Sequence, residues 1–134
     1  MPRIIGTILL LIFPWLIFSQ QKTPFVSYDF ENDSNYKNKL KLLKNHPNRE
    51  YEGIIKSIAE LSYNYKDWET AIDHYEKLLV NSPKAENYFK LGVAAARKSL
   101  EVPRFFSVPY VVKARTSVLQ AHELAPNRVV FFNL

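Results

Sequence analysis

The sequence has no cysteine and only three glycines among its 134 residues. Without cysteine the chain cannot form a disulfide framework, a thiolate zinc site, an iron–sulfur cluster or a lipid anchor on an N-terminal cysteine. So few glycines leave no glycine-rich loop for binding phosphates. The net charge of +5 is too small and too dispersed to indicate nucleic-acid binding by itself. Composition therefore excludes most enzyme classes, and the length suffices for one domain.

The N-terminus has the pattern of a secretory signal. Arg3 is followed by a nearly unbroken apolar run over residues 4–18 and then by the small residue Ser19. The run is shorter than the 20 or so residues that span a bilayer, and Pro14 interrupts it. We predict a signal peptide over residues 1–19 and an exported protein, periplasmic or secreted. The alternative is that the segment stays as an anchor, which would be the only membrane contact expected.

The next segment changes from irregular to helical. Residues 20–33 have no helical period and predict an extended leader. From about residue 35 to 45, apolar residues recur at helical spacing, with Ser34 as the expected N-cap. Four lysines share this helix, and they suggest nucleic-acid or anionic-lipid binding, or else a solvated face. No arginine or aromatic residue joins them on the polar face, so the solvated face is favoured and no nucleic-acid partner is expected. These lysines are Lys37, Lys39, Lys41 and Lys44.

Two amphipathic helices follow, and they predict a helical hairpin. Apolar residues have helical spacing over 51–65 and again over 68–79. Asp67 is placed to cap the second helix, which should end near Asn81 because Ser82–Pro83 follows.

The same pattern then recurs along the chain. Ala71–Tyr75–Pro83 and Ala114–Val118–Pro126 have identical spacing, and the aromatic residues that follow each proline repeat at the same offsets. We therefore predict tandem hairpin repeats over about 51–83 and 85–126, with the start of a further helix over 128–134.

The stretch from Tyr51 to Pro83, with its segment YKDWETAIDHYEKLLVNSP, resembles a tetratricopeptide repeat. The chain departs from that signature at Ser62 and Ala95, where the family has an aromatic residue. The resemblance implies an all-α solenoid of about two repeats plus flanking helices in residues 34–134, stabilised between neighbouring hairpins. The residues expected to pack the repeats together are Ala59, Ala71, Tyr75, Pro83, Leu91, Gly92, Ala114, Ala121 and Pro126.

About ten extra residues separate the halves of the second repeat, within 95–112. They are either a flexible loop or extensions of both helices. We favour the extensions, with one helix running to about Leu100 and the next starting near Val108 after a linker over 101–106. In that arrangement Ser107 caps the second helix and Pro109 lies in its first turn. The side chains expected to cover the apolar ends of the hairpin are Phe105, Phe106 and Tyr110.

No constellation in the sequence indicates catalysis or a cofactor. The three histidines, His46, His74 and His122, are too scattered for a metal signature and are expected to be exposed on helices. Neighbouring carboxylates are expected to be surface groups, and the G-x-S-x-G nucleophile turn is missing. We therefore expect a non-enzymatic protein without a cofactor.

The resemblance also implies a concave groove lined by the first helix of each repeat. Its candidate residues are Lys56, Glu60, Tyr63, Phe89, Val93 and Arg97. The alternative for Phe89 and Val93 is packing on the preceding helix. The sequence thus predicts a module of the bacterial cell envelope that binds a segment of an unknown protein or peptide. The alternatives are a subunit that self-associates through its C-terminal edge, and a truncated member of a longer family.

Overall fold

The computed structural model describes residues 28–127, which form an all-α fold. A short 3-10 helix, η1 (Phe30–Asn32), precedes five α-helices, and the described part contains no strand. The helices are α2 (Ser34–Lys44), α3 (Glu52–Asn64), α4 (Trp68–Asn81), α5 (Ala85–Glu101) and α6 (Arg104–Leu124). For residues 28–127, the predicted all-α fold class is confirmed. The predicted signal peptide, most of the leader and the predicted helix over 128–134 lie outside the described residues.

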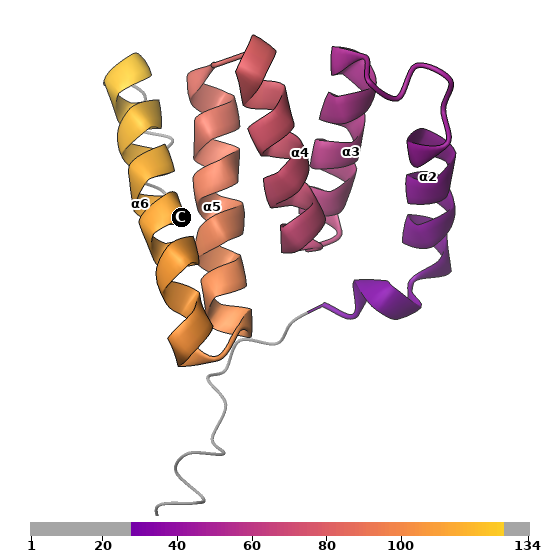
Figure 1. The fold of residues 1–134 in the computed structure, drawn as a ribbon, viewed down its shortest axis with the longest axis horizontal. Helices are drawn as coiled ribbons and strands as arrows, with labels where there is room; N and C mark the ends of the chain where they lie inside the picture. The colour runs from indigo at the N-terminus through magenta and orange to yellow at the C-terminus, as the bar shows by residue number, and fades with distance from the viewer. Residues whose placement is uncertain (1–27, 128–134) are drawn as a thin grey trace, which may run out of the picture.

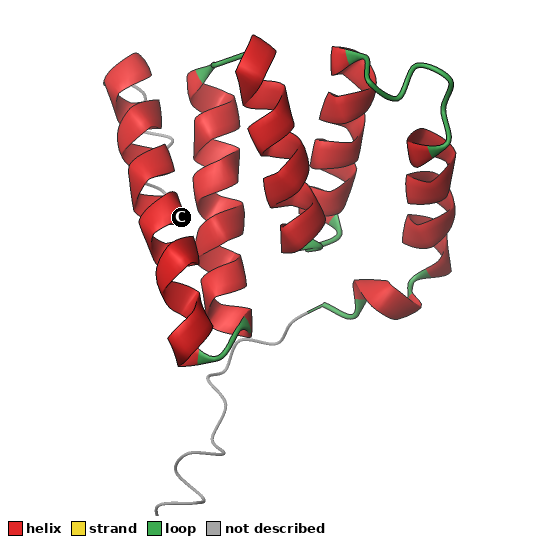
Figure 2. Ribbon diagram, viewed as in Figure 1, coloured by secondary structure: helices red, strands yellow, loops and turns green. Residues whose placement is uncertain are grey.

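The helices stand side by side in a single row and alternate in direction (Figure 1). Each helix packs mainly on its neighbours in sequence, so that α3 contacts α2 and α4, and α5 contacts α4 and α6. Short loops join α3 to α4, α4 to α5 and α5 to α6, and a longer loop over residues 45–51 joins α2 to α3 (Figure 2). This order follows from the loop lengths, because helices joined by a few residues can only pack antiparallel.

The core lies between α3, α4 and α5 and combines small residues with large ones. Ala59 and Ala71 have no exposed surface, and Tyr75 and Leu91 are buried beside them. Of the residues predicted to pack the repeats, Ala121 is also buried and Ala114 packs against the core cluster. The two prolines, Pro83 and Pro126, are exposed next to helix ends and pack no core.

Gly92 lets α5 and α6 approach closely. A Cβ atom at this position would lie 2.7 Å from the Val118 side chain and 3.2 Å from the carbonyl oxygen of Ala114. A side chain at position 92 would force Val118 and the α6 backbone to shift, so glycine allows these two helices to cross at this short distance. The predicted role of a small residue at Gly92 therefore agrees with the geometry.

The start of α2 differs from the prediction in two respects. Asp33, rather than Ser34, is the N-cap, and its carboxylate accepts a hydrogen bond from the Tyr36 backbone N–H at 3.1 Å. Ser34 is instead the first helical residue. The end of the predicted extended leader is also not extended throughout, since residues 30–32 form one turn of 3-10 helix.

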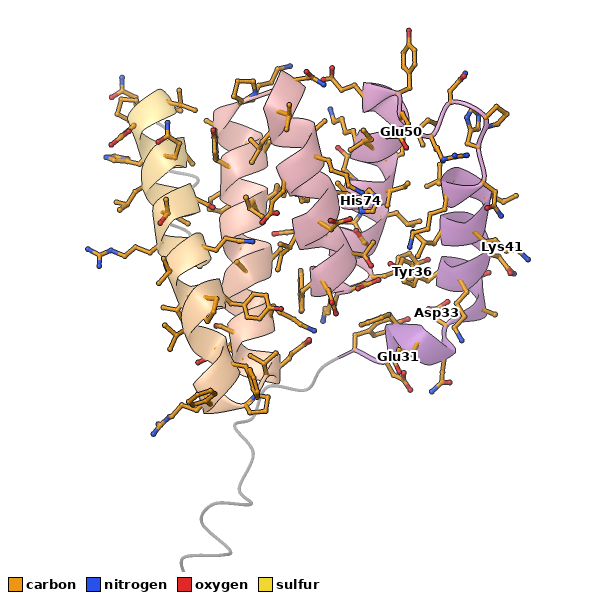
Figure 3. The ribbon with its side chains drawn as sticks, viewed as in Figure 1. Glu31, Asp33, Tyr36, Lys41, Glu50 and His74 are labelled. Carbon is orange, nitrogen blue, oxygen red and sulfur yellow. The ribbon has the colours of Figure 1, made fainter. Side chains whose placement is uncertain are left out.

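An aromatic cluster fixes α2 to the turn between α3 and α4. Tyr36 points from α2 toward the neighbouring helices (Figure 3). Its hydroxyl is buried and donates a 2.5 Å hydrogen bond to the Asp67 carboxylate, while its ring stacks on Tyr65. Phe30 adds an edge contact to Tyr36. Asp67 also accepts from the Thr70 backbone N–H, which confirms its predicted capping role. One carboxylate thus caps α4 and holds α2.

The extra residues of the second hairpin do extend both helices, as favoured, but α6 begins earlier than predicted. It starts at Arg104 after Pro103, so the linker shrinks to two residues. Ser107 is not a cap, because its hydroxyl donates to the Arg104 carbonyl within the helix. Pro109 lies inside α6 rather than in its first turn.

The aromatic residues at this corner also differ from the prediction. Phe105 and Phe106 are exposed and cover no hairpin end, whereas Tyr110 does pack against the core cluster.

Candidate protein-binding groove

The predicted groove residues come from α3 and α5, two helices that lie on either side of α4 in the row (Figure 1). Lys56 and Glu60 are exposed on α3 and form an ion pair at 3.9 Å, one helical turn apart. Exposed pairs of this kind contribute little to stability, so both side chains are available to a partner.

Tyr63 forms an aromatic platform between α3 and α5. Its half-buried ring makes edge contacts with Trp68 and Tyr75, with ring centroids 5.5 and 6.2 Å apart. The ammonium group of Lys90, on α5, lies 4.3 Å from the centroid of the same ring. Burial raises the pKa of the Tyr63 hydroxyl, and the nearby charge of Arg97 acts in the opposite direction. A cation from α5 therefore lies against this ring, which makes Tyr63 the centre of the candidate site.

The three candidates on α5 differ in exposure. Val93 is buried, so it belongs to the packed interior and cannot contact a partner directly. Phe89 is half-buried, and Arg97 is exposed. The alternative that Phe89 and Val93 pack on the preceding helix agrees with the burial of Val93. The accessible candidates are Lys56, Glu60, Tyr63, Phe89 and Arg97.

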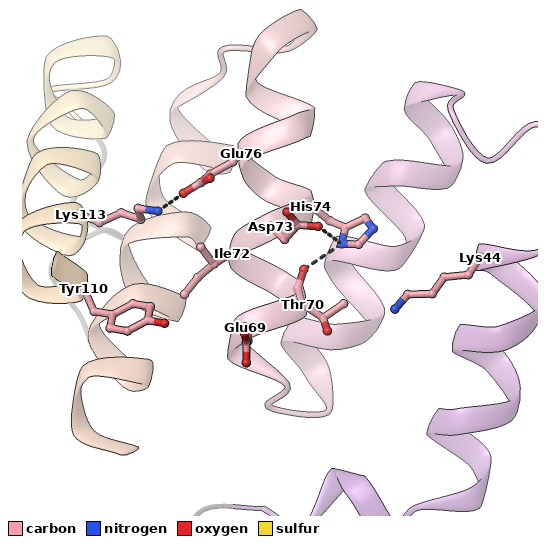
Figure 4. Close-up of a pocket in the computed structure, with 9 residues that line it drawn as sticks. All are labelled: Lys44, Glu69, Thr70, Ile72, Asp73, His74, Glu76, Tyr110 and Lys113. Carbon is pink, nitrogen blue, oxygen red and sulfur yellow. Dashed lines mark hydrogen bonds and ion pairs between the residues drawn. The ribbon is translucent and has the colours of Figure 1, made fainter. Parts of the chain in front are cut away.

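A separate cleft that the sequence did not predict lies around α4. One cavity of about 440 Å³ extends from Lys44 on α2 past His74 to Lys113 on α6 (Figure 4). A second, of about 270 Å³, shares Lys44 and His74 and is closed by Ile55 and Ile58 of α3. None of the six predicted groove residues lines either cavity.

His74 is the least expected member of this cleft. The prediction of an exposed histidine is wrong, because the side chain is only 9% exposed. It lies at the cavity wall with Lys44 of α2 and Ile58 of α3. Its Nδ1 lies 2.9 Å from the carbonyl oxygen of Thr70, one turn earlier in α4. Burial lowers the pKa of His74 below its usual value, although the Thr70 carbonyl acts in the opposite direction. The imidazole is therefore neutral at pH 7.

This depressed pKa predicts a stability that depends on pH. His74 binds a proton more readily in the unfolded chain than in the folded one. The stability that the folded protein has with a neutral His74 is therefore complete above about pH 6.5 and is lost as the pH falls. We expect the melting temperature to fall between pH 7 and pH 5.5, and to fall less in the His74→Gln variant. His122→Gln, on the exposed surface of α6, is the control and should keep the wild-type dependence. If calorimetry shows the same change of melting temperature with pH for all three proteins, this role of His74 is contradicted.

The cleft is lined mainly by charged and polar side chains. Within residues 28–127 no three histidine or acidic side chains lie close enough to hold a metal ion. The carboxylates of Asp73 and Glu76 are paired with Lys77 and Lys113. None of the helices in this part of the chain is long and apolar enough to cross a membrane.

Comparison with known proteins adds no relative to these observations. Searches with family models, against curated proteins and against solved structures find no match to the chain.

Proposed function

We propose that the chain is a tetratricopeptide-like interaction module that binds a segment of another protein along the faces of α3 and α5. Three features support it: the row of antiparallel helices, the close crossing at Gly92, and the small buried residues Ala59 and Ala71. The apolar run over residues 4–18 supports a place in the bacterial envelope after export. Such a module acts by binding, without chemistry of its own.

The surface around Tyr63 is the observation that carries this proposal. Binding hot spots favour a rigid aromatic side chain surrounded by groups that exclude water, and Tyr63 has that setting. Edge contacts with Trp68 and Tyr75 hold its ring in place. Lys90 and Arg97 of α5 provide positive charge near it. An extended or helical segment with an apolar anchor and a flanking acidic group fits this arrangement.

Alanine replacement tests the site. We expect Tyr63→Ala and Phe89→Ala each to reduce capture of a partner from envelope extracts at least about tenfold, or ~1.4 kcal/mol. Lys37→Ala and Lys41→Ala, on the outer surface of α2, are the controls and should capture wild-type amounts. Tyr63 also packs in the core, so melting curves must show that each variant is folded at the assay temperature. Equal losses from the α2 lysines would indicate general charge attraction and contradict the proposal.

A further inference from the structure

The N-terminal half of α6 exposes five apolar side chains, which together are called the ridge: Phe105, Phe106, Val108, Val111 and Val112. Phe105 is 86% exposed and Phe106 is 62% exposed, and their rings touch edge to face. The three valines are each more than half exposed. α6 stands at the end of the helix row (Figure 1), so no described helix covers its outward side. An apolar surface of this kind marks a contact site.

The charges on α6 are all of one sign over most of its length. Arg104 and Arg115 are exposed at the two ends of the ridge along the helix. No aspartate or glutamate occurs between Glu101 and Glu123. Glu101 does not offset these cations, because it is partly covered and pairs with Lys98 at 3.9 Å. The ridge therefore combines apolar side chains with unopposed positive charge, and its complement is an apolar surface bordered by anions.

A second copy that pairs through its own α6 offers this surface positive charge and no negative charge between Glu101 and Glu123. Pairing two α6 helices antiparallel about Val112 would place the two Arg115 side chains within about 9 Å of each other along the helix axes. Two like charges beside an apolar contact oppose such a pair. A bilayer with anionic lipids offers the opposite arrangement, because its acyl region lies directly beneath a layer of negative headgroups.

We propose that the ridge on α6 docks on a lipid surface that carries anionic headgroups. The rings of Phe105 and Phe106 and the adjoining valines enter the interface between headgroups and acyl chains, as in amphipathic helices that lie on membranes. Arg104 and Arg115 reach the headgroups while their aliphatic stems stay along the apolar layer. This contact is independent of the groove around Tyr63 and of the apolar run over residues 4–18.

The absence of native cysteine allows a direct test in the full chain. A single cysteine introduced by Val108→Cys is labelled with an environment-sensitive fluorophore, and a Lys37→Cys label on α2 is the matched control. Each protein is mixed with two kinds of vesicle. One contains phosphatidylcholine alone, and the other contains phosphatidylcholine and phosphatidylglycerol in equal amounts. We expect the label at 108 to brighten with the anionic vesicles and to be quenched by brominated lipid, while the label at 37 does neither. Residues 1–27 are common to both proteins, so their own membrane affinity cannot produce this difference.

Variants then identify the contacts. Phe105→Ser/Phe106→Ser should lower the vesicle partition constant measured at the label on 108 at least about tenfold. Leu42→Ser/Val80→Ser, which removes two exposed apolar residues elsewhere, should leave it unchanged. Arg104→Glu/Arg115→Glu should lower it at least about tenfold on phosphatidylglycerol vesicles only. Equal brightening at 37 and 108, or none at 108, would overturn the proposal. So would a dimer in sedimentation that Phe105→Ser/Phe106→Ser abolishes without any vesicle signal, because the ridge would then bind a second copy.

Discussion

Replacing Tyr75 with alanine is expected to lower the free energy of unfolding by about 3–5 kcal/mol, as removal of a buried aromatic side chain does elsewhere. Tyr75 is only 2% exposed and belongs to the cluster that joins α3, α4 and α5. Its ring also supports Tyr63 from within the core. Chemical denaturation of the two proteins measures the difference.

Tyr51→Ala is the matched control for that experiment. Tyr51 is 72% exposed, and the hydrogen bonds recorded for it involve only its backbone groups before α3. Its loss should change the free energy of unfolding by no more than about 0.5 kcal/mol. Similar costs for the two tyrosines would show that the core does not lie between α3, α4 and α5.

Ala71→Leu should be the next most damaging change, at a cost of about 1–3 kcal/mol. Ala71 has no exposed surface and lies in the same cluster as Ala59 and Ala94, so three extra carbon atoms have no space to occupy. Ala96→Leu makes the same change at an exposed position of α5 and should be nearly neutral. A leucine at position 71 that leaves thermal stability unchanged would contradict the proposed repeat register.

The sequence predicted the central hairpin well because its signals are local. Asp67 caps α4 as expected, and α4 ends at Asn81, immediately before Ser82–Pro83. Apolar periodicity and capping residues act within one or two turns, so they can be recognised without knowledge of the tertiary structure.

The start of α6 could not be predicted in the same way. An isolated helix would be most stable with Pro109 in its first turn, because the backbone N–H groups of that turn have no partner within the helix and proline loses nothing by lacking one. In the folded chain α6 begins five residues before Pro109, and its extra turn runs beside the end of α5. Packing against α5 therefore outweighs the local preference of the proline.

The residues that the sequence analysis missed depend on contacts between distant segments. Tyr36 reaches Asp67 across 31 positions of the chain, and His74 is buried on α4 beside Ile55 and Ile58 of the neighbouring helix α3. No periodicity within one helix indicates either contact. Val93 is a similar case. Its position along the helix predicted a groove residue, but the surrounding structure buries it.

Site-specific photocrosslinking in living cells tests the proposed groove most directly. A photoreactive amino acid replaces Lys56 on α3 or, as the control, Lys77 on α4. The two lysines are matched, since their side chains are 57% and 55% exposed and each pairs with a carboxylate one helical turn away. The proposed function predicts a discrete protein adduct from position 56 that is absent from position 77. Adducts of equal yield and identity from both positions, or from position 77 alone, would contradict it.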